Sequence, residues 1–163
     1  MFHLETRNGH EKNYIVSKIF VDTNVFVYTL DKRDEIKQEK ARRILKKIVE
    51  LHQPVISTQV IKEFYVVAIN KMNADHFIVK NIIHNFRNME IVNNDLELIE
   101  QAIDISVISQ VSFWDSLIVA AAEKANCEFI FSEDLNPGQT YRGVMVINPF
   151  EKEDCLTHIS HSS

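Results

Sequence analysis

The sequence predicts one α/β domain, with a mainly parallel central sheet and helices on both of its faces. Short runs of β-branched and aromatic residues alternate with longer segments of helical periodicity, a pattern typical of βαβ units. The chain has only 3 Gly and 3 Pro among its 163 residues, which favours long helices and short loops. The sequence contains no internal repeat or low-complexity linker that would divide a chain of this length into two domains.

The individual elements follow from the periodicity along the chain. Ile19, Phe20 and Val21 are β-formers without alternation, so a strand at 18–21 is expected to be covered on both faces. Further strands are predicted at 55–56, 90–92, 128–131 and 144–147. Helices are predicted over 25–28, 32–51, 58–71, 74–86, 96–107 and 113–125. Residues 1–17 are predicted to be an N-terminal extension, and 151–163 a polar C-terminal tail that frays.

Apolar stripes predict which helix faces point inward. The helix over 32–51 is expected to bury an apolar stripe, with its Lys and Arg residues largely outside it. The stripe consists of Ile36, Ala41, Ile44, Leu45, Ile48 and Val49. The helix over 74–86 is expected to bury Phe77, Ile78, Ile82 and Phe86. The helix over 113–125 is apolar nearly all round, which predicts a central position.

Composition and charge bound the class of protein. With 45% hydrophobic and 25% charged residues, the chain is typical of a soluble globular domain. It has no apolar run near the ~18 residues needed to span a bilayer, and its first residues lack a signal-peptide pattern. Cys127 and Cys155 have neither metal-ligand nor redox spacing, so we expect a reducing, cytoplasmic location. A net charge of -5 argues against binding nucleic acid by bulk attraction, but a metal-binding carboxylate cluster would itself contribute negative charge.

Asp22 follows the first predicted strand directly. In open α/β sheets, ligands bind outside the carboxyl ends of the strands, so Asp22 is placed for a functional role. The alternative is that Asp22 or Thr23 only caps the following helix. Glu133 and Asp134 repeat this arrangement after the apolar strand 129–131, where the alternative is an ordinary turn.

Two further acids lie on apolar helix faces. Glu63 falls within or beside the stripe that Val60 and Phe64 begin, and a buried carboxylate is protonated, paired or bound to a cation. Its alternative is an edge position, in solvent or paired with Lys62 or Lys71. Asp115 lies in the most apolar helix of the chain, where it also fits a capping box with Ser112.

Carboxylates gathered at one sheet edge are suited to binding a hard divalent cation such as Mg²⁺ or Mn²⁺. Such ions can ready a water for attack on a phosphodiester and stabilise the charge on the leaving oxygen. The sequence offers no competing catalytic motif: it has no Gly-rich phosphate loop, no G-x-S-x-G and no H-E-x-x-H. Its seven His residues are scattered along the chain, without metal-ligand spacing.

Four segments in order resemble the motifs of PIN-domain nucleases, and the last strand with Asn148-Pro149-Phe150 is similar to the usual end of that domain. The motif-like segments are 19–25, 57–64, 113–118 and 131–135. The resemblance covers 18–150 and implies a three-layer α/β/α PIN-like fold. In its small single-domain form, the chain is most similar to VapC, the toxin of VapBC toxin–antitoxin pairs. It departs from the pattern in its N-terminal extension, its acidic C-terminal tail and the extra acid Glu133.

The resemblance implies a metal-dependent endoribonuclease. By position in the motifs, the ligands of Mg or Mn would be Asp22, Asp115 and Asp134. Glu63 would complete the site through water or orient the attacking water, with Asn24 and Ser132 as supporting hydrogen-bond partners. The resemblance also implies a homodimer, a VapB-like antitoxin in the active-site groove, and a tRNA or rRNA substrate.

Two other functions are compatible with the residues. One is a non-catalytic RNA- or protein-binding module on the same fold. The other is a phosphatase of the haloacid-dehalogenase type, which requires an Asp-x-Asp sequence where this chain has Asp22-Thr23-Asn24. For a nuclease, the candidate RNA-binding cations are Lys37, Lys40 and Arg43, although such cations often form only a solvated helix face.

Overall fold

The central sheet has six strands among the described residues. The computed structural model describes residues 16–151, 155–156 and 159. The strand order is β3-β2-β1-β4-β6-β5, and all neighbours are parallel except β5 and β6. The strands are β1 (Lys18–Val21), β2 (Gln53–Ser57), β3 (Glu90–Val92), β4 (Phe129–Phe131), β5 (Thr140–Tyr141) and β6 (Val144–Ile147). The predicted α/β class is confirmed.

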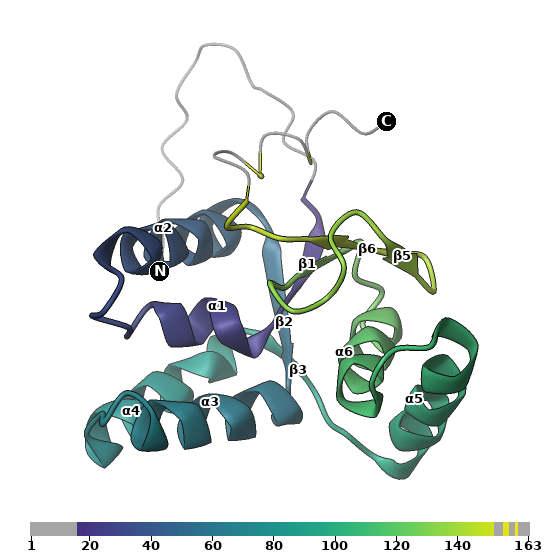
Figure 1. The fold of residues 1–163 in the computed structure, drawn as a ribbon, viewed down its shortest axis with the longest axis horizontal. Helices are drawn as coiled ribbons and strands as arrows, with labels where there is room; N and C mark the ends of the chain where they lie inside the picture. Colours follow the sequence, from purple (N-terminus) through teal and green to yellow (C-terminus); the bar gives the residue numbers. More distant parts are fainter. Residues whose placement is uncertain (1–15, 152–154, 157–158, 160–163) are drawn as a thin grey trace, which may run out of the picture.

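Helices cover the sheet on both sides, which gives three layers (Figure 1). One side carries α1 (Thr23–Tyr28), α2 (Glu35–Leu51), α3 (Thr58–Asn70), α4 (His76–Asn85) and the 3₁₀ turn η1 (Phe86–Asn88). The other side carries α5 (Leu96–Ser109) and α6 (Phe113–Lys124). In the part of the chain that the structure describes, no single helix is long and apolar enough to cross a membrane. The α5 and α6 helices pass that test only together, with a bend of 116° between them.

Side-chain caps set where the helices begin. At each α-helix, an Asp or Ser side chain just before the first turn accepts a hydrogen bond from a free backbone N–H, an interaction that stabilises a helix by about 1 kcal/mol. The capping residues are Asp22, Asp34, Ser57, Asp75, Asp95 and Ser112. The capping role considered for Asp22 is therefore real.

The strand register brings the candidate residues together. Val21 at the end of β1 pairs with Phe131 at the end of β4. Because the two strands are parallel and end at the same level, the next residues, Asp22 and Ser132, emerge side by side. The N–H of Asp22 continues the ladder by donating to Phe131 O at 3.0 Å.

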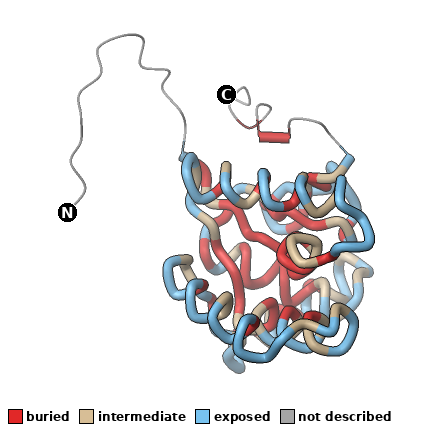
Figure 2. The backbone as a smooth tube through the Cα atoms, turned by 90° about the vertical axis from the view of Figure 1, so that its left-hand side faces the viewer, coloured by how far each residue is buried: buried red, intermediate tan, exposed pale blue. Residues whose placement is uncertain are grey.

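The core fills both faces of the sheet. On one face, α6 is buried continuously from Ser116 to Ala122, which confirms its predicted central position. On the other, the rings of Phe26, Phe64 and Phe86 pack with centroids 4.9 to 6.3 Å apart. Figure 2 shows buried backbone (red) in the interior of the domain, with exposed backbone (pale blue) around it.

Some sequence expectations are wrong. Phe77 and Ile78 are 77% and 58% exposed, because α4 turns Val79 toward the core instead. On α2, the predicted stripe is wrong at its two ends, where Ile36 and Val49 are exposed. It is confirmed between them, where Ala41, Ile44 and Ile48 are buried.

The strand β5 is absent from the prediction. Its two residues join β6 through Arg142 and Gly143, which both have positive φ, as a tight hairpin turn requires. A strand of two residues carries no periodicity that a sequence pattern could reveal.

The ends of the described chain differ from the predicted extension and tail. Ser17, assigned to the extension, is buried and donates to Glu128 Oε2 at 3.0 Å. In the predicted tail, Cys155, Leu156 and Ile159 are buried, so these three residues do not follow the expectation of fraying. Most of the predicted extension, residues 1–15, and the rest of the tail after Glu151 lie outside the described residues.

Candidate functional site

Asp22 is the buried centre of the site, with only 3% of its surface exposed. Its Oδ1 accepts from the Thr23 N–H at 2.7 Å, and its Oδ2 accepts from Ser132 Oγ at 2.7 Å. The carboxylate is thus held by hydrogen bonds at the N-terminus of α1, and within the described residues no Lys, Arg or His pairs with it.

Burial raises the pKa of Asp22 to about 6, from an ordinary value of 3.8. The hydrogen bonds from Ser132 and Thr23 favour the charged form and oppose this rise. The nearby negative charges of Asp134 and Glu63 add to it. A carboxylate in this setting is stabilised when a cation is brought close.

Asn24 and Ser132 join Asp22 to Asp134. The Asn24 amide donates to Asp134 Oδ2 at 3.1 Å and, more weakly, to Asp22 Oδ2 at 3.4 Å. Ser132 Oγ, which donates to Asp22, in turn accepts from the N–H groups of Asp134 and Leu135. Both predicted supporting residues therefore contact the predicted acids directly.

Glu63 is held by two side chains that the sequence reasoning missed. Its Oε2 accepts from Thr23 Oγ1 and its Oε1 accepts from Gln59 Nε2, both at 2.9 Å. Gln59 is buried, and the same amide nitrogen donates to the Trp114 carbonyl at 3.3 Å. The spacing of Gln59 to Glu63, four residues along one helix face, is the sequence signal that was available. Glu63 forms no ion pair with Lys62 or Lys71 among the described residues.

Asp115 is positioned by its own helix start. Ser112 Oγ accepts from the Asp115 N–H at 3.0 Å and donates to Asp115 Oδ2 at 2.7 Å. The capping role considered from the sequence is therefore present. Within the described chain, Asp115 shares no hydrogen-bond donor with Asp22, Glu63 or Asp134. The nearest link is Gln59, which bonds both Glu63 and the carbonyl of Trp114 beside Asp115.

The carboxylate oxygens of the site suit a hard cation, but the structure brings fewer of the predicted ligands together than the sequence predicts. Among the described residues, no group of three or more His, Cys, Asp or Glu side chains is arranged to hold a metal ion. Asp22 and Asp134, however, share the Asn24 amide as a hydrogen-bond donor. Mg²⁺ is usually bound by one or two carboxylates and several waters. The ligand set predicted from the sequence stays a prediction.

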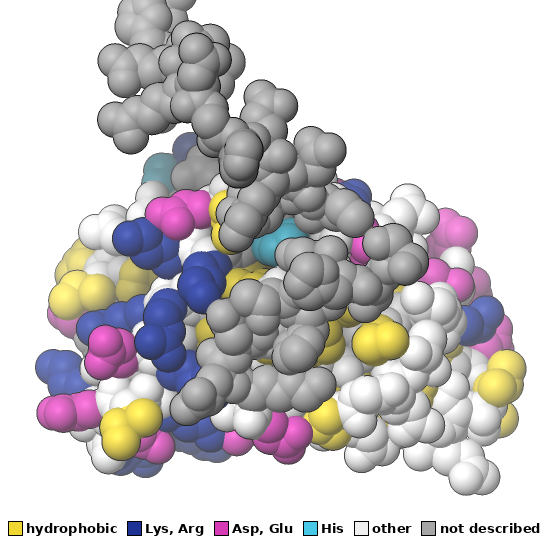
Figure 3. Space-filling view, turned by 90° about the horizontal axis from the view of Figure 1, so that it is seen from above, with side chains coloured by type: hydrophobic (Ala, Val, Ile, Leu, Met, Phe, Trp, Pro, Cys, Tyr) yellow, Lys and Arg dark blue, Asp and Glu magenta, His cyan; other side chains and the backbone are white. Residues whose placement is uncertain are grey.

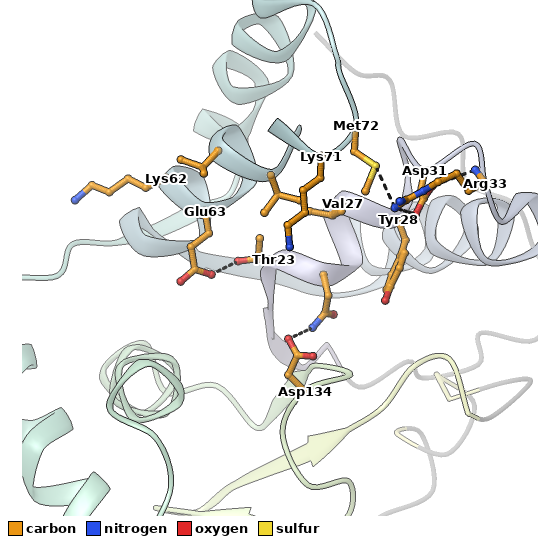
Figure 4. A pocket seen from close by; sticks show the side chains of 13 residues that line it. Thr23, Val27, Tyr28, Asp31, Arg33, Lys62, Glu63, Lys71, Met72 and Asp134 are labelled. Carbon is orange, nitrogen blue, oxygen red and sulfur yellow. Dashed lines mark hydrogen bonds and ion pairs between the residues drawn. The ribbon is translucent and has the colours of Figure 1, made fainter. Parts of the chain in front are cut away.

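A pocket of about 570 Å³ opens beside these acids. Glu63 and Asp134 form part of its wall, together with Thr23 and Asn24 from α1. Figure 4 shows the bond between Glu63 and Thr23 at one end and Arg33, paired with Asp31, at the other. Glu63 and Asp134 are thus reachable from a concave surface of a size that suits small ligands, whereas Asp22 and Asp115 do not line it.

The cations of α2 gather on one part of the surface (Figure 3). Lys37 Nζ pairs with Glu133 Oε1 at 2.5 Å, and Lys40 Nζ donates to the Phe150 carbonyl at 2.8 Å. Neither lysine lines the acid pocket. The extra acid Glu133 is thereby accounted for as the partner of Lys37.

Comparison with known families identifies the fold. The family model of the PIN domain matches residues 19–142. The chain belongs to the PIN domain family. The resemblance stated from the motifs is therefore confirmed at the level of the family and its fold.

Solved structures from toxin–antitoxin systems share this architecture. The VapC20 toxin of Mycobacterium tuberculosis, which cleaves the sarcin–ricin loop, is 19% identical with a TM-score of 0.56, covering 71% of this chain and 91% of that chain. VapBC2 of Rickettsia felis is 14% identical with a TM-score of 0.58, covering 79% of this chain and 96% of that chain. A toxin–antitoxin complex from Klebsiella pneumoniae is 17% identical with a TM-score of 0.60, covering 80% of this chain and 97% of that chain. These likenesses concern the fold, and no curated protein sequence matches the chain.

Proposed function

We propose that this PIN domain is a metal-dependent endoribonuclease that hydrolyses phosphodiester bonds in RNA. The observation that carries the proposal is a carboxylate cluster without a compensating cation. Asp22 is buried, its pKa is raised, and the charges of Glu63 and Asp134 lie close enough to contribute to that rise. Such a cluster destabilises the fold unless a cation binds, so its presence beside an open pocket indicates use in function.

In this proposal Asp22 and Asp134, with Asp115, hold Mg²⁺ or Mn²⁺. A bound ion of this kind neutralises the phosphate and readies a water for attack on phosphorus. Ser132 and Asn24 fix the orientation of the carboxylates through the hydrogen bonds described above. Glu63, held at both oxygens by Thr23 and Gln59, orients the attacking water.

Cleavage of total cellular RNA by the purified protein tests the proposal. With Mg²⁺ or Mn²⁺ we expect discrete fragments, and with EDTA or with Asp115→Asn we expect none. Asp104→Asn is the matched control, because it removes one exposed carboxylate from α5 outside the cluster. Cleavage that is indifferent to EDTA and to Asp115→Asn would exclude this site as its source.

The same experiment separates the nuclease from a binding module on the same fold. The hydrogen bonds between Asp115 and Ser112 favour a purely structural role for this acid. Failure to cleave RNA, together with failure of Mg²⁺ or Mn²⁺ to bind in calorimetry, would favour the binding module. Release of inorganic phosphate from small phosphate esters without RNA cleavage would favour a phosphatase.

We further propose that the nuclease is a toxin, acting in the cytoplasm as a homodimer and restrained by a VapB-like antitoxin. The support is the shared fold with a VapC toxin that cleaves the sarcin–ricin loop, and with solved toxin–antitoxin complexes. An rRNA or tRNA would then be the substrate. Expression in a bacterial host should stop growth, and Asp22→Asn should relieve the arrest. Sedimentation equilibrium tests the dimer.

A further inference from the structure

The pocket beside the acids extends well past them. Glu63 and Asp134 occupy part of its wall, and the rest is formed by the last turns of α1 and α3 with the residues that follow. That part includes the apolar side chains of Val27 and Met72 (Figure 4). The volume exceeds what one hydrated cation between carboxylates needs, so the pocket has room for part of a substrate.

Three cations line the pocket, Arg33, Lys62 and Lys71, and Lys71 is the uncompensated one that points into it. Arg33 is neutralised, because its guanidinium donates to both oxygens of Asp31 at 2.8 Å. Lys71, at the C-terminal cap of α3, has no side-chain hydrogen bond or ion pair in the described part of the chain. Figure 4 shows its side chain pointing into the pocket, toward Thr23 and Asp134, whereas Lys62 extends away from the other labelled side chains.

A free ammonium group at this place has a specific use. The chain carries a net charge of -5, and the acid cluster itself repels a polyanion. An RNA strand that reaches the acids therefore needs a local positive contact, and phosphate oxygens are the strongest acceptors that a lysine meets in nucleic acid. The apolar wall beside Lys71 suits the face of a base or ribose.

We infer that Lys71 binds the phosphate of a nucleotide that flanks the scissile phosphodiester, with Val27 and Met72 against the base or sugar of that nucleotide. The inference rests on the nuclease function proposed above. It assigns the pocket a single-stranded segment of RNA, because a duplex cannot place one nucleotide inside a concave site.

Lys71→Gln and Lys62→Gln form a matched pair, since both remove one lysine charge from the wall of the same pocket, Lys62 within α3 and Lys71 at its C-terminal cap. The probe is a short fluorescent single-stranded RNA in EDTA, with its Kd measured by anisotropy over a range of KCl concentrations. Lys71→Gln should raise Kd several-fold and reduce the slope of log K against log salt by about 0.7, the value for one phosphate contact on a single strand. Lys62→Gln should leave both quantities near the wild-type values, and Lys71→Arg should retain binding.

Equal effects of the two Gln variants would overturn the inference. A second result would also overturn it: Lys71→Gln loses binding to an Asp/Glu-rich peptide but keeps its affinity for RNA. That result would assign the pocket to a protein partner. Cleavage assays on the wild-type protein keep the two proposals apart. RNA binding that depends on Lys71 without any cleavage would contradict the nuclease alone, and cleavage without dependence on Lys71 would contradict this inference alone.

Discussion

Glu133 and Asp134 are consecutive carboxylates on one loop, and their surroundings are opposite. Glu133 is paired with Lys37, whose ammonium also lies 4.0 Å from the centroid of the Tyr28 ring. Asp134 faces the other way, and its side chain accepts from the amide of Asn24. Within the described residues, no cation compensates Asp134, and the same holds for Asp22 and Glu63.

The contrast separates charges that serve the fold from charges that oppose it. In the Lys37–Glu133 pair the two charges compensate each other, and the aromatic ring adds to the attraction for the ammonium. The buried carboxylate of Asp22, with Glu63 and Asp134 nearby and no cation, reduces stability, and such groups are retained where function uses them. Removing a charge should therefore have opposite consequences on the two sides of this one loop.

The largest effect is expected on catalysis. Asp22→Asn should reduce RNA cleavage by at least about 1000-fold, since charge stabilisation of several kcal/mol is lost and each 1.36 kcal/mol is a factor of ten. Glu133→Gln, one residue away from Asp134, should stay within a few-fold of wild type. The measurement is the initial rate of cleavage in Mg²⁺ for both variants. Comparable losses of cleavage rate in Asp22→Asn and Glu133→Gln would contradict the distinction between the acid cluster and the Lys37–Glu133 pair.

The second effect concerns stability without metal. Asp22 has a higher pKa in the folded protein than in the unfolded chain, so the folded state binds more protons between pH 4 and pH 6. The cost of ionising Asp22 is absent below about pH 4 and fully present above about pH 6. At 1.36 kcal/mol per pKa unit, the rise from 3.8 to about 6 corresponds to about 3 kcal/mol.

Urea unfolding in EDTA at several pH values measures this cost. At pH 7, the free energy of unfolding of Asp22→Asn should exceed that of the wild type by up to about 3 kcal/mol. This difference should shrink as the pH falls toward 4. Added Mg²⁺ should stabilise the wild type and not the variant, by about 2.7 kcal/mol at 100 times the Kd. A difference between the two proteins that does not change with pH would show that burial does not disfavour the charge of Asp22.

The sequence predicted the acids better than it predicted their contacts. Strand ends are visible as apolar runs that stop at Asp22 and before Asp134, and parallel pairing then places both at one edge. The contacts that hold Glu63, from Thr23 and Gln59, depend on how α1 and α3 pack across the sheet edge, which no local pattern encodes.

The exposed apolar residues show a second limit of sequence reasoning. A periodic stripe marks a helix face, but it does not tell at which turn the helix leaves the core. Ile36 at the start of α2 was therefore predicted to be buried, although it is 84% exposed. Lys71 was predicted only as a possible partner of Glu63, because its place in the pocket depends on where α3 ends relative to α1.

A smaller effect is expected at Ser132, which supports the uncompensated side without carrying charge. Its hydroxyl donates to Asp22 and accepts from two backbone N–H groups of the next loop. Ser132→Ala should weaken Mg²⁺ binding about tenfold, at the lower end for a residue that orients a metal ligand. Calorimetric titration with Mg²⁺ measures it, and Ser106→Ala on α5 is the matched control. An unchanged Mg²⁺ affinity in Ser132→Ala would mean that the hydroxyl does not orient Asp22 for the ion.

The smallest effect is expected on the compensated side, where it has the opposite sign. Lys37→Met should lower the free energy of unfolding by about 1 kcal/mol, because it leaves the half-buried Glu133 without its partner. Lys46→Met is the control, since Lys46 is exposed and lies 3.9 Å from Glu50.

Adding Glu133→Gln to Lys37→Met should restore part of the lost stability, because the uncompensated charge is then gone. At the cluster, Asp22→Asn should stabilise the metal-free protein by itself, because no cation is lost with the carboxylate. If Glu133→Gln were also stabilising in the wild-type background, the Lys37 pair would not compensate Glu133. The loop would then carry two uncompensated acids, rather than one acid that serves the fold and one that serves the site.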